Sequence, residues 1–122
     1  MALMIDLTSM RVKQHKAIPA ELLVQAEKIG LALARLRVAR HVTQEVAAIR
    51  AGISRNSAWR MEHGDPGVAL GQILRYLDAI APGATLLSLL AEDDPSLTAL
   101  ALKERRQRAH GLTKAELQEI DF

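Results

Sequence analysis

The 122 residues are enough for one domain with a modest core, and a net charge of +2 does not by itself point to a partner. Apolar residues make up 49% of the chain but aromatic residues only 2%, a balance that favours an all-α fold over a β-sandwich or barrel. The absence of cysteine excludes disulfides and thiolate metal sites, and without a signal peptide or long apolar run we expect a soluble, cytoplasmic protein.

The first predicted helix follows a polar N-terminal arm, residues 1–19. Pro19 suits the first turn of a helix that starts near Ala20 and ends near Arg40. Apolar residues recur along it at helical spacing. They are Leu22, Ala26, Ile29, Leu33 and Leu36.

Two short helices follow, joined by a tight turn. Thr43 suits the N-cap of a helix over 44–51, and Gly52 suits the left-handed position that ends it. Ser54 then caps a helix over 55–63, which Gly64 and Pro66 stop. Two helices joined in this way form the unit that places its second helix in the major groove of DNA.

Two further helices complete a predicted DNA-binding domain over residues 20–91. Apolar residues form one stripe over 70–80, and Pro82-Gly83 breaks that helix. A leucine-rich helix follows Thr85. This leucine-rich helix and the C-terminal extension are the candidates for a dimer surface.

The predicted C-terminal extension, residues 92–122, contains two helices. Asp94 and Pro95 suit the N-cap and first position of one helix, which Gly111 should end. Thr113 and Glu116 then form a capping box for a last helix. Leu112 and Leu117 are placed as its hydrophobic staple.

The side-chain pattern of the two short helices predicts an inward and an outward face. Alanines at 47, 48 and 51 leave room for a close crossing by Ala58 and Met61. At about 100° per residue, Asn56 and Arg60 then point outward, and Trp59 lies on the flank, partly exposed. Trp59 is either a DNA contact or a packing residue that folds back over the helix at 44–51 or over the N-terminal arm.

Charge is distributed unevenly along the chain. Residues 1–60 carry ten Lys and Arg against four Asp and Glu, whereas residues 61–102 carry one Arg against six acidic residues. A basic first half indicates a polyanionic partner such as nucleic acid, and ordinary solvated helix faces are the alternative. Basic residues of the arm either contact phosphate or the minor groove or belong to a disordered tail, and those of the extension face DNA, a partner or only water. They are Arg11, Lys13, Lys16, Arg105, Arg106 and Arg108.

The segment TQEVAAIRAGISRNSAWRMEHGDP resembles the Xre family of lambda-repressor-like regulators, over about Ile29 to Leu90. The resemblance implies a five-helix helix-turn-helix domain that binds a double-stranded DNA operator. It implies that Thr43 and Gln44 bind the DNA backbone and that Arg55, Asn56 and Arg60 read bases, with Ser57 at a phosphate. Ser54 and Trp59 complete the expected DNA-binding set, and Arg37 and Glu62 are implied as a structural ion pair.

The segment GDPGVALGQILRYLDAIAP resembles the HipB-like antitoxin branch of that family, whose members repress their own operon and bind a HipA-type kinase toxin. The sequence therefore predicts a transcriptional repressor, with an antitoxin that acts mainly by binding such a toxin as the alternative. A homodimer is expected because one recognition helix covers few bases.

No catalytic or metal-binding pattern accompanies these motifs. The histidines are too dispersed for a ligand set, and no nucleophile, acid–base pair or phosphate loop is complete. We therefore expect no enzyme activity, no cofactor and no metal.

Overall fold

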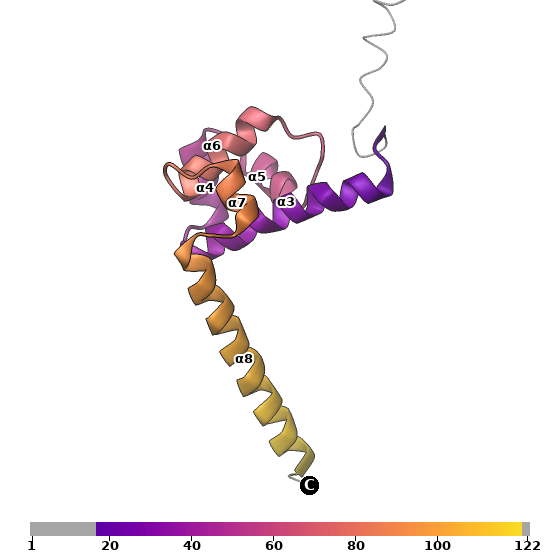
Figure 1. Ribbon diagram of the computed structural model, residues 1–122, viewed down its shortest axis with the longest axis vertical. Helices are drawn as coiled ribbons and strands as arrows, with labels where there is room; N and C mark the ends of the chain where they lie inside the picture. The colour runs from indigo at the N-terminus through magenta and orange to yellow at the C-terminus, as the bar shows by residue number, and fades with distance from the viewer. Residues whose placement is uncertain (1–16, 121–122) are drawn as a thin grey trace, which may run out of the picture.

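The structure is a computed structural model that describes residues 17–120, and for 110–120 only the course of the backbone. The described residues form helices and no strand, which confirms the predicted all-α class. Helices α4 to α7 gather on one side of α3, and α8 extends away from them (Figure 1). Their bounds are α3 Ala20–Ala39, α4 Gln44–Ala51, α5 Arg55–Glu62, α6 Leu70–Ile80, α7 Leu86–Ala91 and α8 Pro95–Ile120.

The turn between α4 and α5 has the predicted caps. The Thr43 hydroxyl accepts a hydrogen bond from the Val46 amide at 3.2 Å, which satisfies a free donor in the first turn of α4. Gly52 ends α4 with φ +69°, a left-handed conformation that glycine adopts without strain. Ser54 accepts from the Ser57 amide at 3.0 Å and so starts α5. Local chemistry therefore fixes both ends of the turn.

Alanines allow α4 and α5 to pack closely. Ala47, Ala48 and Ala51 of α4 are buried, and so are Ala58 and Met61 of α5. With so little side-chain volume at the crossing, the backbones of the two helices come close, and the relative position of α5 is fixed by packing. The core continues through larger residues, among them Leu33, Leu36, Tyr76, Leu77 and Leu89.

Two glycines allow α3 to approach the end of α5. A Cβ atom added to Gly30 would lie 2.6 Å from the Met61 carbonyl oxygen and 2.8 Å from the Gly64 nitrogen. A Cβ on Gly64 would lie 2.4 Å from Cα of Glu27. Any side chain at either position would collide with backbone, so this contact requires both glycines.

The prediction of two helices after Asp94 is wrong. Asp94 does cap α8, since its Oδ1 accepts from the Ser96 amide at 2.9 Å, but the helix runs for 26 residues from Pro95 to Ile120. Gly111 and Thr113 therefore lie inside one helix, not at an end and an N-cap. A glycine within a helix costs only about 0.5–1 kcal/mol relative to alanine, and no proline follows to stop the chain.

Candidate nucleic-acid interface

The first turn of α5 presents two of the three predicted base-reading side chains to solvent. Ala58 and Met61 hold the opposite face of the helix in the core, at 0% and 3% exposure. Arg55 and Asn56 are exposed, and no hydrogen bond or ion pair with another described residue engages either side chain. A guanidinium and a carboxamide thus stand free on a rigid helix. Their donors and acceptors match the edges of guanine and adenine in the major groove.

The two serines at the start of α5 bind each other. The Ser54 hydroxyl donates to Ser57 Oγ at 2.9 Å, in addition to its capping bond with the Ser57 amide. Ser57 Oγ accepts in this bond, so its own proton remains available to an acceptor outside the protein. A phosphate oxygen is such an acceptor.

Arg60 differs from Arg55 because it already has a partner. Its Nε donates to Oδ2 of Asp65 at 2.7 Å, and the Arg60 side chain is 41% exposed. The bond ties Arg60 to the loop that follows α5. A base or phosphate must therefore bind the terminal Nη groups or displace Asp65, which the sequence pattern did not indicate.

Trp59 lies on the exposed flank of α5, as the helical wheel predicts. Its side chain is 51% exposed and stacks on the His63 ring, with centroids 3.8 Å apart and planes at 19°. Nδ1 of His63 lies 2.7 Å from the Trp59 carbonyl oxygen, which holds the imidazole in this position. The indole thus has one face covered by His63 rather than by the core.

Thr43 and Gln44 lie at the N-terminus of α4. The Thr43 side chain is exposed, and Gln44 is half-buried. The first amides of a helix carry a partial positive charge, and this end is suited to a phosphate. The residues predicted to bind the DNA backbone and those predicted to read bases thus lie on neighbouring segments, at the start of α4 and the start of α5.

A hydrogen-bonded network holds the C-terminal end of α5. Nε and Nη2 of Arg37 donate to the two carboxylate oxygens of Glu62 at 2.6 and 3.0 Å, and the Tyr76 hydroxyl donates to Glu62 Oε2. The Glu62 hydrogen bonds raise the pKa of Arg37, and burial, followed by the bond to Glu62, raises the pKa of Tyr76. The sequence predicts the pair of Arg37 and Glu62. It also offers one clue to Tyr76, because a buried tyrosine hydroxyl usually requires a partner.

The structure adds internal ion pairs to the interpretation of the basic first half. Two arginines of α3 and its C-cap Arg40 form ion pairs with carboxylates from the second half of the chain. The pairs are Arg35 with Glu104, Arg37 with Glu62 and Arg40 with Asp94. With Arg60, four of the ten basic residues before position 61 are paired within the protein. Internal ion pairs therefore account for part of the charge imbalance, and binding of a polyanion is not needed for that part. Three of the remaining basic residues, Arg11, Lys13 and Lys16, lie outside the described residues.

Within residues 17–109, whose side chains the structure describes, no group of three or more His, Asp or Glu side chains is arranged to hold a metal ion. None of the described helices is both long and apolar enough to span a membrane.

The family model described as a helix-turn-helix domain matches residues 28–90, just over half of the chain. The match runs from the middle of α3 into α7 and so includes the turn between α4 and α5. No curated protein and no solved structure gives a significant match.

Proposed function

The chain belongs to the helix-turn-helix family, and we propose that it is a sequence-specific transcriptional repressor that binds an operator in double-stranded DNA as a homodimer. The family itself indicates a DNA-binding regulator. The proposal adds specificity, repression and the dimer.

One observation carries the proposal: the backbone of the first turn of α5 is held in place, whereas its two outward side chains are unpaired among the described residues. Ser54 caps the helix, Ala58 and Met61 fix it in the core, and Arg55 and Asn56 have no partner among the described residues. A merely solvated helix face does not need this combination. In a groove, each bidentate contact of this type is worth about 1–3 kcal/mol of discrimination between bases.

The homodimer follows from the size of this surface. One turn of one helix contacts only a few base pairs, so a specific site requires two copies of the helix. In helix-turn-helix dimers, the two half-sites are centred about 34–36 Å apart, one turn of DNA. A repressor of this kind therefore requires a two-fold symmetric site.

A second candidate is an antitoxin of the HipB-like type, whose main role is to bind a HipA-type kinase toxin. It is favoured by one observation, the exposure of Leu87 and Leu90 on α7, at 81% and 51%. These leucines provide an apolar surface for a protein partner. Leu87→Lys should weaken binding of a HipA-type kinase co-expressed from a neighbouring gene, without loss of DNA binding.

The test of the main proposal is selection of DNA from a random pool by the full chain. A repressor should enrich an inverted repeat whose half-sites are about one helical turn apart. The enriched site should bind far more tightly than a scrambled duplex of equal length in 0.15 M salt, and should block transcription when placed across a promoter. Enrichment of no sequence would contradict specific recognition, and enrichment without promoter block would contradict repression.

A further inference from the structure

Most of α8 lies outside the packed core. At about 1.5 Å per residue, its 26 residues extend about 39 Å. Its start is anchored: Leu97 packs against the core, and Glu104 accepts hydrogen bonds from Arg35 of α3 at 2.8 and 3.0 Å. Beyond that point the helix projects away from the other helices (Figure 1). A helix with few tertiary contacts is only marginally stable alone in water, so a partner for this part is expected.

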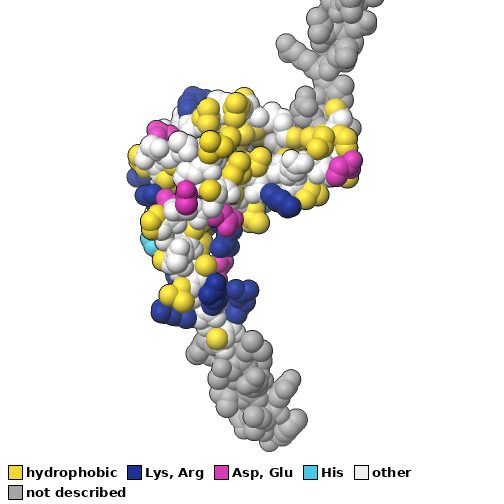
Figure 2. Space-filling model, viewed as in Figure 1, with side chains coloured by type: hydrophobic (Ala, Val, Ile, Leu, Met, Phe, Trp, Pro, Cys, Tyr) yellow, Lys and Arg dark blue, Asp and Glu magenta, His cyan; other side chains and the backbone are white. Residues whose placement is uncertain are grey.

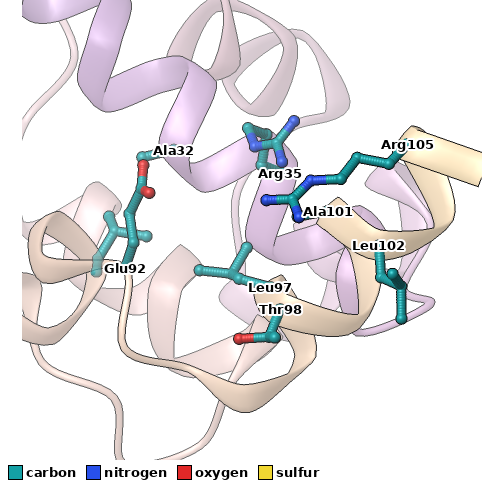
Figure 3. A pocket seen from close by; sticks show the side chains of 9 residues that line it. Ala32, Arg35, Glu92, Leu97, Thr98, Ala101, Leu102 and Arg105 are labelled. Atoms are coloured by element: carbon teal, nitrogen blue, oxygen red, sulfur yellow. The ribbon is translucent and has the colours of Figure 1, made fainter. Parts of the chain in front are cut away.

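A pocket lies where α8 leaves the core, between α3, α7 and α8. Most of its floor is apolar, formed by Ala32, Leu89, Leu97, Ala101 and Leu102. Glu92 and Thr98 also line it. Leu102 is 46% exposed, so part of this apolar surface remains in contact with water. Figure 3 shows the guanidinium of Arg105 extending back toward Arg35 at the rim. The pocket therefore combines an apolar floor with a cationic edge.

The cations at this edge exceed the anions. Arg35, Arg105 and Arg108 stand here against Glu92 and Glu104, an excess of one positive charge. Glu104 is engaged by Arg35, whereas Arg105 and Arg108 are exposed and form no ion pair with another described residue. Lys and Arg side chains gather on this part of α8 in the space-filling view (Figure 2). The surface is suited to an occupant that carries both carboxylates and apolar side chains.

The distal part of α8 has the residue types that such an occupant needs. At about 100° per residue, positions 105, 108, 112, 116 and 119 fall within about 80° of one another on the helix. Along this stripe the residues are Arg, Arg, Leu, Glu and Glu. If a second α8 lies antiparallel to the first and the two cross at position 112, position 105 of one helix lies opposite 119 of the other, and 108 lies opposite 116. Each pairing then joins an arginine to a glutamate.

The same chain cannot bring its own glutamates to this surface. Position 119 lies 14 residues beyond position 105 in one continuous helix, which separates them by about 21 Å along its axis. The glutamates must therefore come from another molecule.

We propose that the surface formed by Arg105, Arg108 and the pocket between α3, α7 and α8 binds the distal part of α8 from a second copy, with the two helices antiparallel about residue 112. The inference rests on the proposed homodimer and assigns its interface. Two copies related by a two-fold axis form each arginine–glutamate pairing twice, four in all.

Sedimentation equilibrium of the full chain across a concentration series tests the proposal, with and without 1 M salt. Arg105→Glu with Arg108→Glu should raise the dimer dissociation constant roughly 10- to 100-fold, because four pairings become repulsive. Glu116→Arg with Glu119→Arg should do the same independently. The chain with all four substitutions should recover, because each pairing is restored with opposite sign.

Arg106→Glu is the matched control, because position 106 lies about 100° from position 105 and off the stripe. It should leave the dissociation constant nearly unchanged, and thermal melting should show that every variant folds. A dimer unaffected by Arg105→Glu with Arg108→Glu would leave the homodimer intact but overturn this interface. Failure of the fourfold variant to recover, or an equal effect of Arg106→Glu, would also overturn it. A natural chain that stays monomeric at all concentrations, with or without operator DNA, would contradict the dimer itself.

Discussion

Replacement of Glu62 by alanine should strongly destabilise the protein. The Glu62 side chain is 4% exposed and accepts two hydrogen bonds from Arg37 and one from Tyr76. Without it, the guanidinium of Arg37, whose side chain is 17% exposed, keeps only its bond to the Val42 carbonyl oxygen among described residues. The buried Tyr76 hydroxyl loses its partner at the same time.

The expected loss in the free energy of unfolding is large because Glu62→Ala leaves the charge of Arg37 without its partner in a mostly buried site. Removal of one partner from such a pair costs about 3–5 kcal/mol. Because a folded domain is stable by only about 5–15 kcal/mol, this is a large fraction of the total. The melting temperature should fall by roughly 10–30 °C.

Thermal and urea denaturation followed by circular dichroism measure the effect. The matched control is Glu104→Ala, which removes a similar two-point contact with Arg35 but at a site where both side chains are more than a third exposed. Solvent screens that pair, so its loss should change stability far less. Equal losses of stability in Glu62→Ala and Glu104→Ala would refute the argument that burial makes the Arg37–Glu62 pair contribute more to stability than the Arg35–Glu104 pair.

Three further predictions concern other parts of the fold. Gly30→Ala should destabilise the protein by about 1–3 kcal/mol through collision with backbone, whereas Gly71→Ala, where a Cβ meets nothing within 4 Å, should stabilise it slightly; equal urea midpoints would contradict this. The pKa of Asp94, lowered to about 2 mainly by its hydrogen bond from Arg40, gives stability that is present above about pH 4 and lost as the pH falls toward 2. The stability advantage over Asp94→Asn should disappear across that range in acid titrations, and a difference independent of pH would contradict the assignment. Iodide should quench the fluorescence of Trp59 in the free protein and quench it less when operator DNA is bound; quenching that DNA leaves unchanged would make Trp59 a packing residue.

Local signals in the sequence predict the short helices well. Thr43, Gly52 and Ser54 each act on backbone within three residues of their own position, so their effect does not depend on the rest of the fold. Gly111 shows the limit of such signals, because a glycine ends a helix only if the backbone there becomes left-handed. In α8 the helix continues through that position.

Contacts between distant segments could not be predicted in this way. Arg35 and Glu104 lie 69 residues apart, and Gly30 is required only because α3 crosses the end of α5. The bond from Arg60 to Asp65 depends on the path of the loop after α5. For the candidate interface, the sequence therefore predicts which side chains α5 exposes, but not which of them already have a partner within the protein.

Base reading by the first turn of α5 and backbone binding by the start of α4 are best tested by comparing affinity for the selected operator with affinity for a scrambled duplex. Arg55→Ala should weaken operator binding by about 1–3 kcal/mol, roughly 5- to 150-fold, and leave binding to the scrambled duplex much less affected. Gln44→Ala should weaken both by a similar factor. Equal losses on both duplexes for Arg55→Ala, at constant salt and with an unchanged melting temperature, would contradict base reading by α5.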